Sequence, residues 1–215
     1  MQMFASRHTP LGLYRKRVSS ADPLGDPAGI PGAEETPIMR AREEARMLGL
    51  TPLGAFHTAI SVIALVAGLI ALVRDKQISP KNLLGKVYVV TTVVTCVTGF
   101  GIFQHGGFGN AHVLGVITLV VLGVGAVAGQ SDLFGRASRY VETVSYSATL
   151  FFHFIPAITE TSTRLPPGSP LVANADAPAL QVATGVLFVA FLIGAALQVR
   201  RLRAASPATS RSGAP

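Results

Sequence analysis

The sequence is poor in charge: of its 215 residues only 13% are charged, whereas 49% are hydrophobic. A chain of this size with so few charges is hard to reconcile with a surface that faces water on all sides. Its only cysteine is Cys96, which excludes an intramolecular disulfide and a multi-cysteine metal site. Spacings such as HExxH and CxxCH are also missing, so no motif specifies a metal or a covalently attached haem.

Five long apolar runs are what the chain has instead. Each contains about 17 to 20 residues with almost no charge, close to the length that a helix needs to cross a hydrocarbon core of ~30 Å. The runs cover residues 55–73, 87–103, 112–128, 141–158 and 180–199. None alternates polar and apolar residues as a membrane-facing strand does. The sequence therefore predicts an all-α integral membrane bundle of five transmembrane helices, with four as the alternative.

Basic residues flank these runs unequally. Ten lie between the first and second runs, between the third and fourth, and after the fifth: Arg74, Lys76, Lys81, Lys86, Arg136, Arg139, Arg200, Arg201, Arg203 and Arg211. The opposite loops carry only Arg164. The positive-inside rule then predicts a multi-pass protein of the bacterial inner membrane with a cytoplasmic C-terminus. The position of these basic residues at the predicted membrane borders explains the net charge of +7. We therefore expect the lipid bilayer as partner and no nucleic acid.

The predicted organisation is an N-terminal tail, a bundle and a short C-terminal tail. Residues 1–50 form a largely disordered tail with a short helix near 37–48, residues 51–203 form the bundle, and 204–215 are disordered. An odd number of spans would place this tail outside, although no signal peptide is recognised. Because residues 19–37 resemble a disordered or untranslated leader, Met1, Met39 and Met47 remain alternative starts.

Polar residues recur at helical spacing inside two of the runs. Tyr88, Thr92, Thr95 and Gly99 share one face of the second run. In the fourth run the stripe comprises Glu142, Tyr146, Thr149, His153 and Ala157. Such faces should not meet lipid, so we expect both to face the bundle interior.

Four histidines fall at or near the ends of apolar runs, and the predicted topology places all of them toward the outer face. His57, His112 and His153 come within about 8 Å of one plane, and His105 lies at its rim. They are the candidate cofactor-binding residues. Imidazoles grouped in this way could bind a divalent metal, one haem b or a quinone, or relay protons. The alternative is that they are structural residues at the membrane interface.

A second candidate site involves the loop after the fourth run. Glu160 and Arg164 are spaced as a helical ion pair and precede a proline-rich turn. Together with Tyr146, they are candidate ligand-pocket residues near His153.

Several stretches resemble a family of small bacterial multi-spanning membrane proteins of unknown function. They are GKVY at 85–88, TGF at 98–100, the glycine turn at His105, FGRASRY at 134–140, and the region from 145 to 166. The resemblance covers about residues 51–203 and implies no reaction. In outline the chain is also similar to bis-histidine haem bundles, but those place histidines on both membrane faces, so at most one haem is expected.

Two functions follow as expectations. The first is an integral membrane component that is structural or binds a partner, either another protein or a second copy of the chain. The alternative is a redox membrane protein that holds one haem, quinone or metal through the histidines. Whether the chain is an enzyme stays open.

Overall fold

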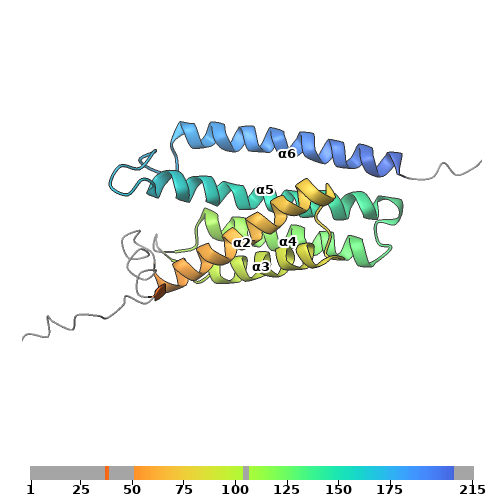
Figure 1. Ribbon diagram of the computed structural model, residues 1–215, viewed down its shortest axis with the longest axis horizontal. Coiled ribbons are helices and arrows are strands. Elements are labelled where there is room, and N and C mark those ends of the chain that lie inside the picture. Colours follow the sequence, from red (N-terminus) through yellow and green to blue (C-terminus); the bar gives the residue numbers. More distant parts are fainter. Residues whose placement is uncertain (1–36, 39–50, 104–106, 206–215) are drawn as a thin grey trace, which may run out of the picture. The chain divides into compact units, whose positions relative to one another are not determined.

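The computed structural model describes residues 37–38, 51–103 and 107–205. Every long regular element in these ranges is an α-helix (Figure 1). The helices are α2 (Pro52–Asp75), α3 (Leu83–Gly99), α4 (Asn110–Gln130), α5 (Ser138–Arg164) and α6 (Pro178–Ala204), and a single 3₁₀ turn, η1 (Gly135–Ala137), precedes α5. The all-α prediction is confirmed, and each of the five apolar runs corresponds to one of these helices. Of the two predicted tails only Pro37 and Ile38, which are helical, and Ala204 and Ala205 are described; the predicted start of the C-terminal tail is corrected there, because Ala204 ends α6 and Ala205 caps it.

Local sequence explains where the helices begin. The Thr51 side chain accepts a hydrogen bond from the Gly54 backbone at 3.1 Å, and Asn82 caps Gly85 in the same way at 2.8 Å. Both are N-cap residues that satisfy a backbone N–H left free at the helix start. Proline occupies the first position of α2 and of α6, where its missing N–H costs nothing.

The helices pack mostly with their neighbours along the chain. The pairs in contact are α2 with α3, α3 with α4, α4 with α5, and α5 with α6, and α2 also reaches α5. Helix α5 therefore lies between α4 and α6 (Figure 1). Glycines bring the helices close together: Gly68 of α2 sits against Tyr88 and Leu150, and Gly125 of α4 sits against Tyr146.

Three helices, α2, α4 and α6, are long and apolar enough to cross a membrane. Helix α3 is apolar but shorter, at 17 residues. Helix α5 differs because most of its buried residues are polar, namely Thr143, Ser145, Tyr146, Ser147, Thr149 and His153. The prediction that its polar stripe faces inward is confirmed at Tyr146, Thr149 and His153.

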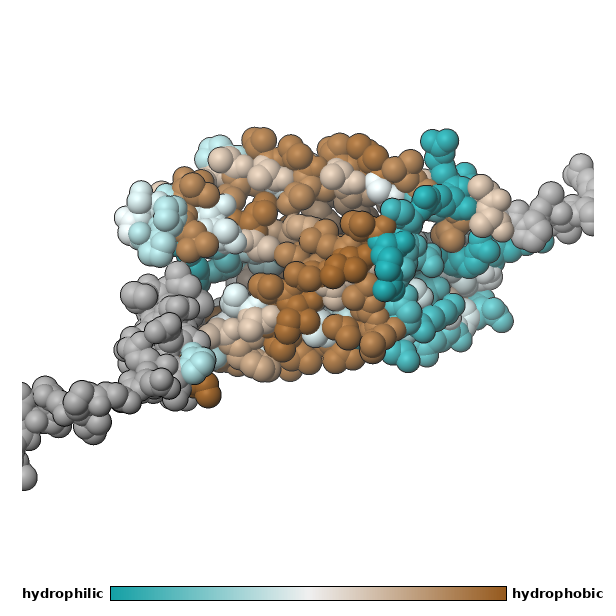
Figure 2. Space-filling model, viewed as in Figure 1, coloured by the Kyte–Doolittle hydropathy of each residue, from teal (hydrophilic) through white to brown (hydrophobic). Residues whose placement is uncertain are grey.

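The outer surface of the helices is apolar. Large apolar side chains are exposed along α2, α4 and α6, among them Val66, Val120 and Val186 at 48%, 60% and 63%. Figure 2 shows this apolar surface over the helices, with hydrophilic residues gathered at the end where α6 terminates. Polar and apolar side chains thus share the interior, whereas the outer sides of α2, α4 and α6 are apolar, unlike those of a water-soluble bundle.

Candidate functional site

The candidate histidines lie at the end of the bundle where α2 and α4 begin and α5 finishes, here called the histidine end. His57 is in the second turn of α2, His112 is in the first turn of α4, and His153 is three turns before the end of α5. The fourth candidate, His105, lies outside the described residues. The three described histidines differ in what their two ring nitrogens contact.

His153 is buried and has one ring nitrogen without a hydrogen-bond partner among the described residues. It is 7% exposed, and its Nδ1 lies 3.0 Å from the Thr149 carbonyl oxygen. Because a carbonyl only accepts, Nδ1 carries the proton and Nε2 of the neutral ring keeps its lone pair. Nε2 is buried and has no hydrogen-bond partner among the described residues. His153 therefore presents an unused acceptor, or ligand atom, inside the bundle.

The ring of His57 has the same tautomer, with its proton on Nδ1. Its Nδ1 lies 3.0 Å from Oγ1 of Thr98, and that hydroxyl is also 2.8 Å from the Val94 carbonyl. The hydroxyl has one proton, which it donates to the carbonyl, so it accepts from Nδ1–H of His57. Gly99 makes room for the ring, since a Cβ there would lie 3.2 Å from Cε1 of His57. Nε2 of His57 thus also keeps its lone pair.

These two histidines come from different helices. His57 lies within electrostatic range of His153 and also of Glu160, near the end of α5. In both rings Nδ1 is held by a fixed acceptor and Nε2 is left available, which is how a protein orients an imidazole that binds a metal or a redox group. Within the described part of the chain, however, no three His, Cys, Asp or Glu side chains are grouped closely enough to hold a metal ion.

His112 is engaged differently. Its Nδ1 accepts a hydrogen bond from the Gly109 backbone N–H at 3.1 Å, which caps the start of α4. Its ring stacks on Phe103 and Phe108, with centroids 5.1 and 5.0 Å away, and more loosely on Phe100. With Nδ1 accepting, the neutral ring carries its proton on Nε2, so it has no lone pair to offer a metal without changing tautomer. The structure therefore gives His112 a capping and packing role.

A directed hydrogen-bond chain links α3 to α5 beside His153. The Tyr88 hydroxyl lies 2.7 Å from Oγ1 of Thr149, and that hydroxyl donates to the Tyr146 carbonyl at 2.8 Å. Tyr88 must therefore be the donor to Thr149. The Tyr88 ring is 6.0 Å from the ring of His153. Two more hydroxyls, those of Thr92 and Thr95, are buried on α3 without a partner among the described residues.

The three ligand-pocket candidates on α5 do not come together. Tyr146 is 1% exposed and packs against Gly125 of α4. Glu160 forms an ion pair with Arg164 one turn later, in the more exposed last turns of the helix. Tyr146 and Glu160 are 14 residues apart, so about 21 Å of helix separates them. Of the three, Glu160 lies within electrostatic range of His57.

The sequence analysis does not identify Gln198, a polar residue with a clear structural role. Gln198 of α6 is 8% exposed; it accepts from Ser147 Oγ at 2.9 Å and donates to the Lys76 carbonyl at 3.0 Å. The only sequence signal is an amide inside an apolar run, two residues before an arginine pair. This residue joins three helices at the end of the bundle opposite to the histidines.

Comparison with known proteins gives no identification: no family model, no curated protein and no solved structure matches the chain.

Proposed function

We propose that this chain is a five-span integral protein of the bacterial inner membrane that serves as a structural or partner-binding component. The observation that carries the proposal is the apolar exterior of α2, α4 and α6. Only 22%, 28% and 6% of their most apolar 18-residue windows are buried within the bundle. Contact with water along three such helices would be strongly unfavourable, whereas hydrocarbon accommodates them.

The position of α5 supports the two additional spans. Although this helix has too many polar residues to cross a bilayer alone, it lies between α4 and α6 and turns its polar face inward. Interhelical hydrogen bonds at Tyr88, Ser147 and His57 satisfy part of that polarity. Polar residues that point into a bundle and hold helices together are the usual arrangement in membrane proteins. Helix α3, which packs between α2 and α4, crosses with them.

Membrane fractionation tests this proposal. The full chain, expressed in a bacterial host, should sediment with membranes, resist alkaline carbonate and urea, and enter solution only with detergent. A peripheral protein would be released by carbonate because it is held by charge and surface contacts. Recovery of folded, monodisperse protein without detergent would overturn the proposal.

The second candidate function is a redox protein that holds one group near His57 and His153. The specific observation is that Nε2 of His153 and the hydroxyls of Thr92 and Thr95 are among the buried polar atoms without partners in the described residues, which also include Nε2 of His112 and the Ser138 hydroxyl. Buried polar atoms normally find a partner: an ordered water or a quinol hydroxyl could donate to Nε2 of His153, and a quinone oxygen could accept from a threonine hydroxyl. A single haem would instead need Nε2 of both histidines as axial ligands.

Spectroscopy separates the two functions. The redox candidate predicts a Soret band, a quinone or stoichiometric metal in the detergent-purified protein, seen by oxidised and dithionite-reduced spectra, lipid extraction and elemental analysis. His57→Ala and His153→Ala should each abolish it, whereas His112→Ala, the matched control, should leave it unchanged. A colourless protein free of quinone and metal would eliminate the redox candidate. A chromophore that survives both substitutions would exclude these histidines as ligands.

A further inference from the structure

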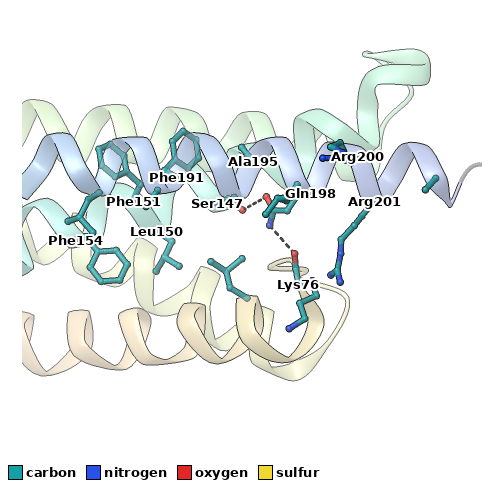
Figure 3. A pocket seen from close by; sticks show the side chains of 16 residues that line it. Lys76, Ser147, Leu150, Phe151, Phe154, Phe191, Ala195, Gln198, Arg200 and Arg201 are labelled. Atoms are coloured by element: carbon teal, nitrogen blue, oxygen red, sulfur yellow. Dashed lines mark hydrogen bonds between the residues drawn. The ribbon is translucent and has the colours of Figure 1, made fainter.

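A groove of about 930 Å³ runs between α5 and α6 toward the C-terminal end of α2. It exists because α6 packs against α5 and not against α2. At the end of α2, Gln198 of α6 donates a hydrogen bond to the Lys76 carbonyl (Figure 3). This hydrogen bond, here called the Gln198 tie, lies at one end of the groove. Along the remaining length of the two helices the groove is open.

The long wall of the groove is apolar. Phe151 and Phe191 stack with ring centroids 5.6 Å apart, and Leu150 and Phe154 continue the same surface along α5. On α6 the wall is hollowed at Gly194, where an added Cβ would meet no atom within 4 Å. The α6 lining runs from Leu187 to Ala204, and its part from Leu187 to the first arginine, Arg200, rises over 13 residue steps, or about 20 Å. That matches one leaflet of a bilayer, ~15 Å of hydrocarbon, together with the start of the headgroup layer.

The end of the groove is cationic. Lys76, Arg200 and Arg201 line it, and Figure 3 shows them around the Gln198 tie. Among the described residues no carboxylate pairs with these three side chains, because the neighbouring Asp75 is engaged by Arg74 at 2.7 Å. The Lys76 ammonium donates a hydrogen bond to the Val73 carbonyl, at 2.6 Å. Three positive charges from two helices are thus held at the mouth of an apolar groove.

We propose that this groove binds one phospholipid with an anionic headgroup, an inference that rests on the membrane location proposed above. The phosphate lies among Lys76, Arg200 and Arg201, and an acyl chain lies on the wall formed by Phe151, Phe154 and Phe191. A basic pocket between transmembrane helices on the cytoplasmic side attracts anionic lipids, and each interfacial cation adds to the affinity. A zwitterionic lipid fits the apolar wall equally well but gains less at the cationic end.

Charge variants test the headgroup. Detergent-purified full chain is mixed with equal amounts of phosphatidylglycerol and phosphatidylcholine, and retained lipid is counted by native mass spectrometry. The wild type should retain one phosphatidylglycerol in preference. The double variant Arg200→Gln/Arg201→Gln should bind it about 30-fold more weakly, as expected for the loss of two interfacial cations. Arg203→Gln is the matched control, since Arg203 is exposed on the same helix but does not line the groove.

Lys76→Gly provides an independent charge variant that the backbone tolerates. Lys76 has a φ of 62°, a left-handed conformation that glycine adopts without strain. This substitution should keep the fold and lower the preference for phosphatidylglycerol by about fivefold. An unchanged preference would remove Lys76 from the site.

Filling the groove tests the acyl chain. Gly194→Leu should lower the retention of both lipids, whereas Gly185→Leu should not, because Gly185 is equally open on α6 but lies outside the groove. Equal retention of the two lipids by the wild type, or equal losses in Arg203→Gln and the double arginine variant, would overturn the proposal. These outcomes are distinct from failure of the membrane proposal, which would appear earlier as protein released by carbonate.

Discussion

Tyr88 and Thr149 form a fully buried contact, both at 0% exposure, with their side-chain oxygens 2.7 Å apart. The two residues have unequal roles because Tyr88 donates and Thr149 accepts. Removing the acceptor leaves a buried hydroxyl proton without a partner, whereas removing the donor leaves Thr149 bonded to the Tyr146 carbonyl. The two substitutions should therefore differ in cost although they break the same hydrogen bond.

We predict that Thr149→Val destabilises the protein by about 1–3 kcal/mol, and Tyr88→Phe by only about 0.6 kcal/mol. The double variant should be no less stable than Thr149→Val, since it removes the orphaned hydroxyl. Unfolding in detergent, followed by circular dichroism, measures the difference. Thr91→Val is the control, because that hydroxyl bonds only to carbonyls of its own helix. A larger loss in Tyr88→Phe than in Thr149→Val would contradict the assigned direction.

Individual residues were predictable where a helical repeat constrains them. Tyr146, Thr149 and His153 share one face at that spacing, and a polar face cannot meet lipid, so their burial follows from sequence. The partner of each was not predictable, because it depends on which helices become neighbours. His112 illustrates this: its role comes from phenylalanines of the preceding segment and from the backbone of Gly109.

At the scale of elements, the apolar runs predicted five helices but not their ends. The fourth run stops near Ile158, yet α5 continues to Arg164, because Glu160 and Arg164 form an ion pair one turn apart. Conversely, α3 begins four residues before its run, where Asn82 caps it, and ends at Gly99. Hydrophobicity reports what contacts lipid, while caps and turn residues decide where hydrogen bonding starts and stops.

Helix α3 also depends on a close approach at its first turn. A Cβ on Gly85 would lie 1.8 Å from the Ser79 carbonyl oxygen, which is backbone of the α2–α3 turn and cannot move aside. On Gly68 of α2 it would meet the Leu150 and Tyr88 side chains at 2.7 and 2.9 Å, and these can shift in part. On Gly123 of α4 it would meet nothing within 4 Å.

We predict the order of damage Gly85→Ala, then Gly68→Ala, then Gly123→Ala. The first should cost about 3 kcal/mol or more and the second about 1–3 kcal/mol by overpacking. The third should be neutral or slightly stabilising, because alanine is the better helix former. The yield of monodisperse protein and its thermal midpoint in detergent measure the series. Gly123→Ala as damaging as Gly85→Ala would contradict the turn geometry.

At the scale of the whole bundle, the described ends differ in charge. The loop from Lys76 to Asn82, the loop from Ser131 to Ala137 and the last turn of α6 lie at one end, and with the adjoining helix ends they carry nine of the ten basic residues in the described ranges. The other end contains the histidines and the loop that follows Arg164. Under the positive-inside rule this asymmetry supports the orientation proposed above, and that proposal requires that α5 cross the bilayer between the two loops that flank it. That requirement concerns the one long helix whose composition alone does not predict crossing.

Cysteine labelling tests the crossing of α5 directly. In a Cys96→Ala background, which removes the buried native thiol, we introduce either Ser131→Cys before α5 or Ser169→Cys after it; both positions are exposed. A membrane-impermeant maleimide added to intact spheroplasts should label Ser169→Cys and leave Ser131→Cys unreacted until the membrane is permeabilised. Labelling of both positions, or of neither, would place the two loops on one side and exclude α5 as a span. Labelling of Ser131→Cys alone would keep the five spans and reverse their orientation, so the cationic groove would face the outer leaflet.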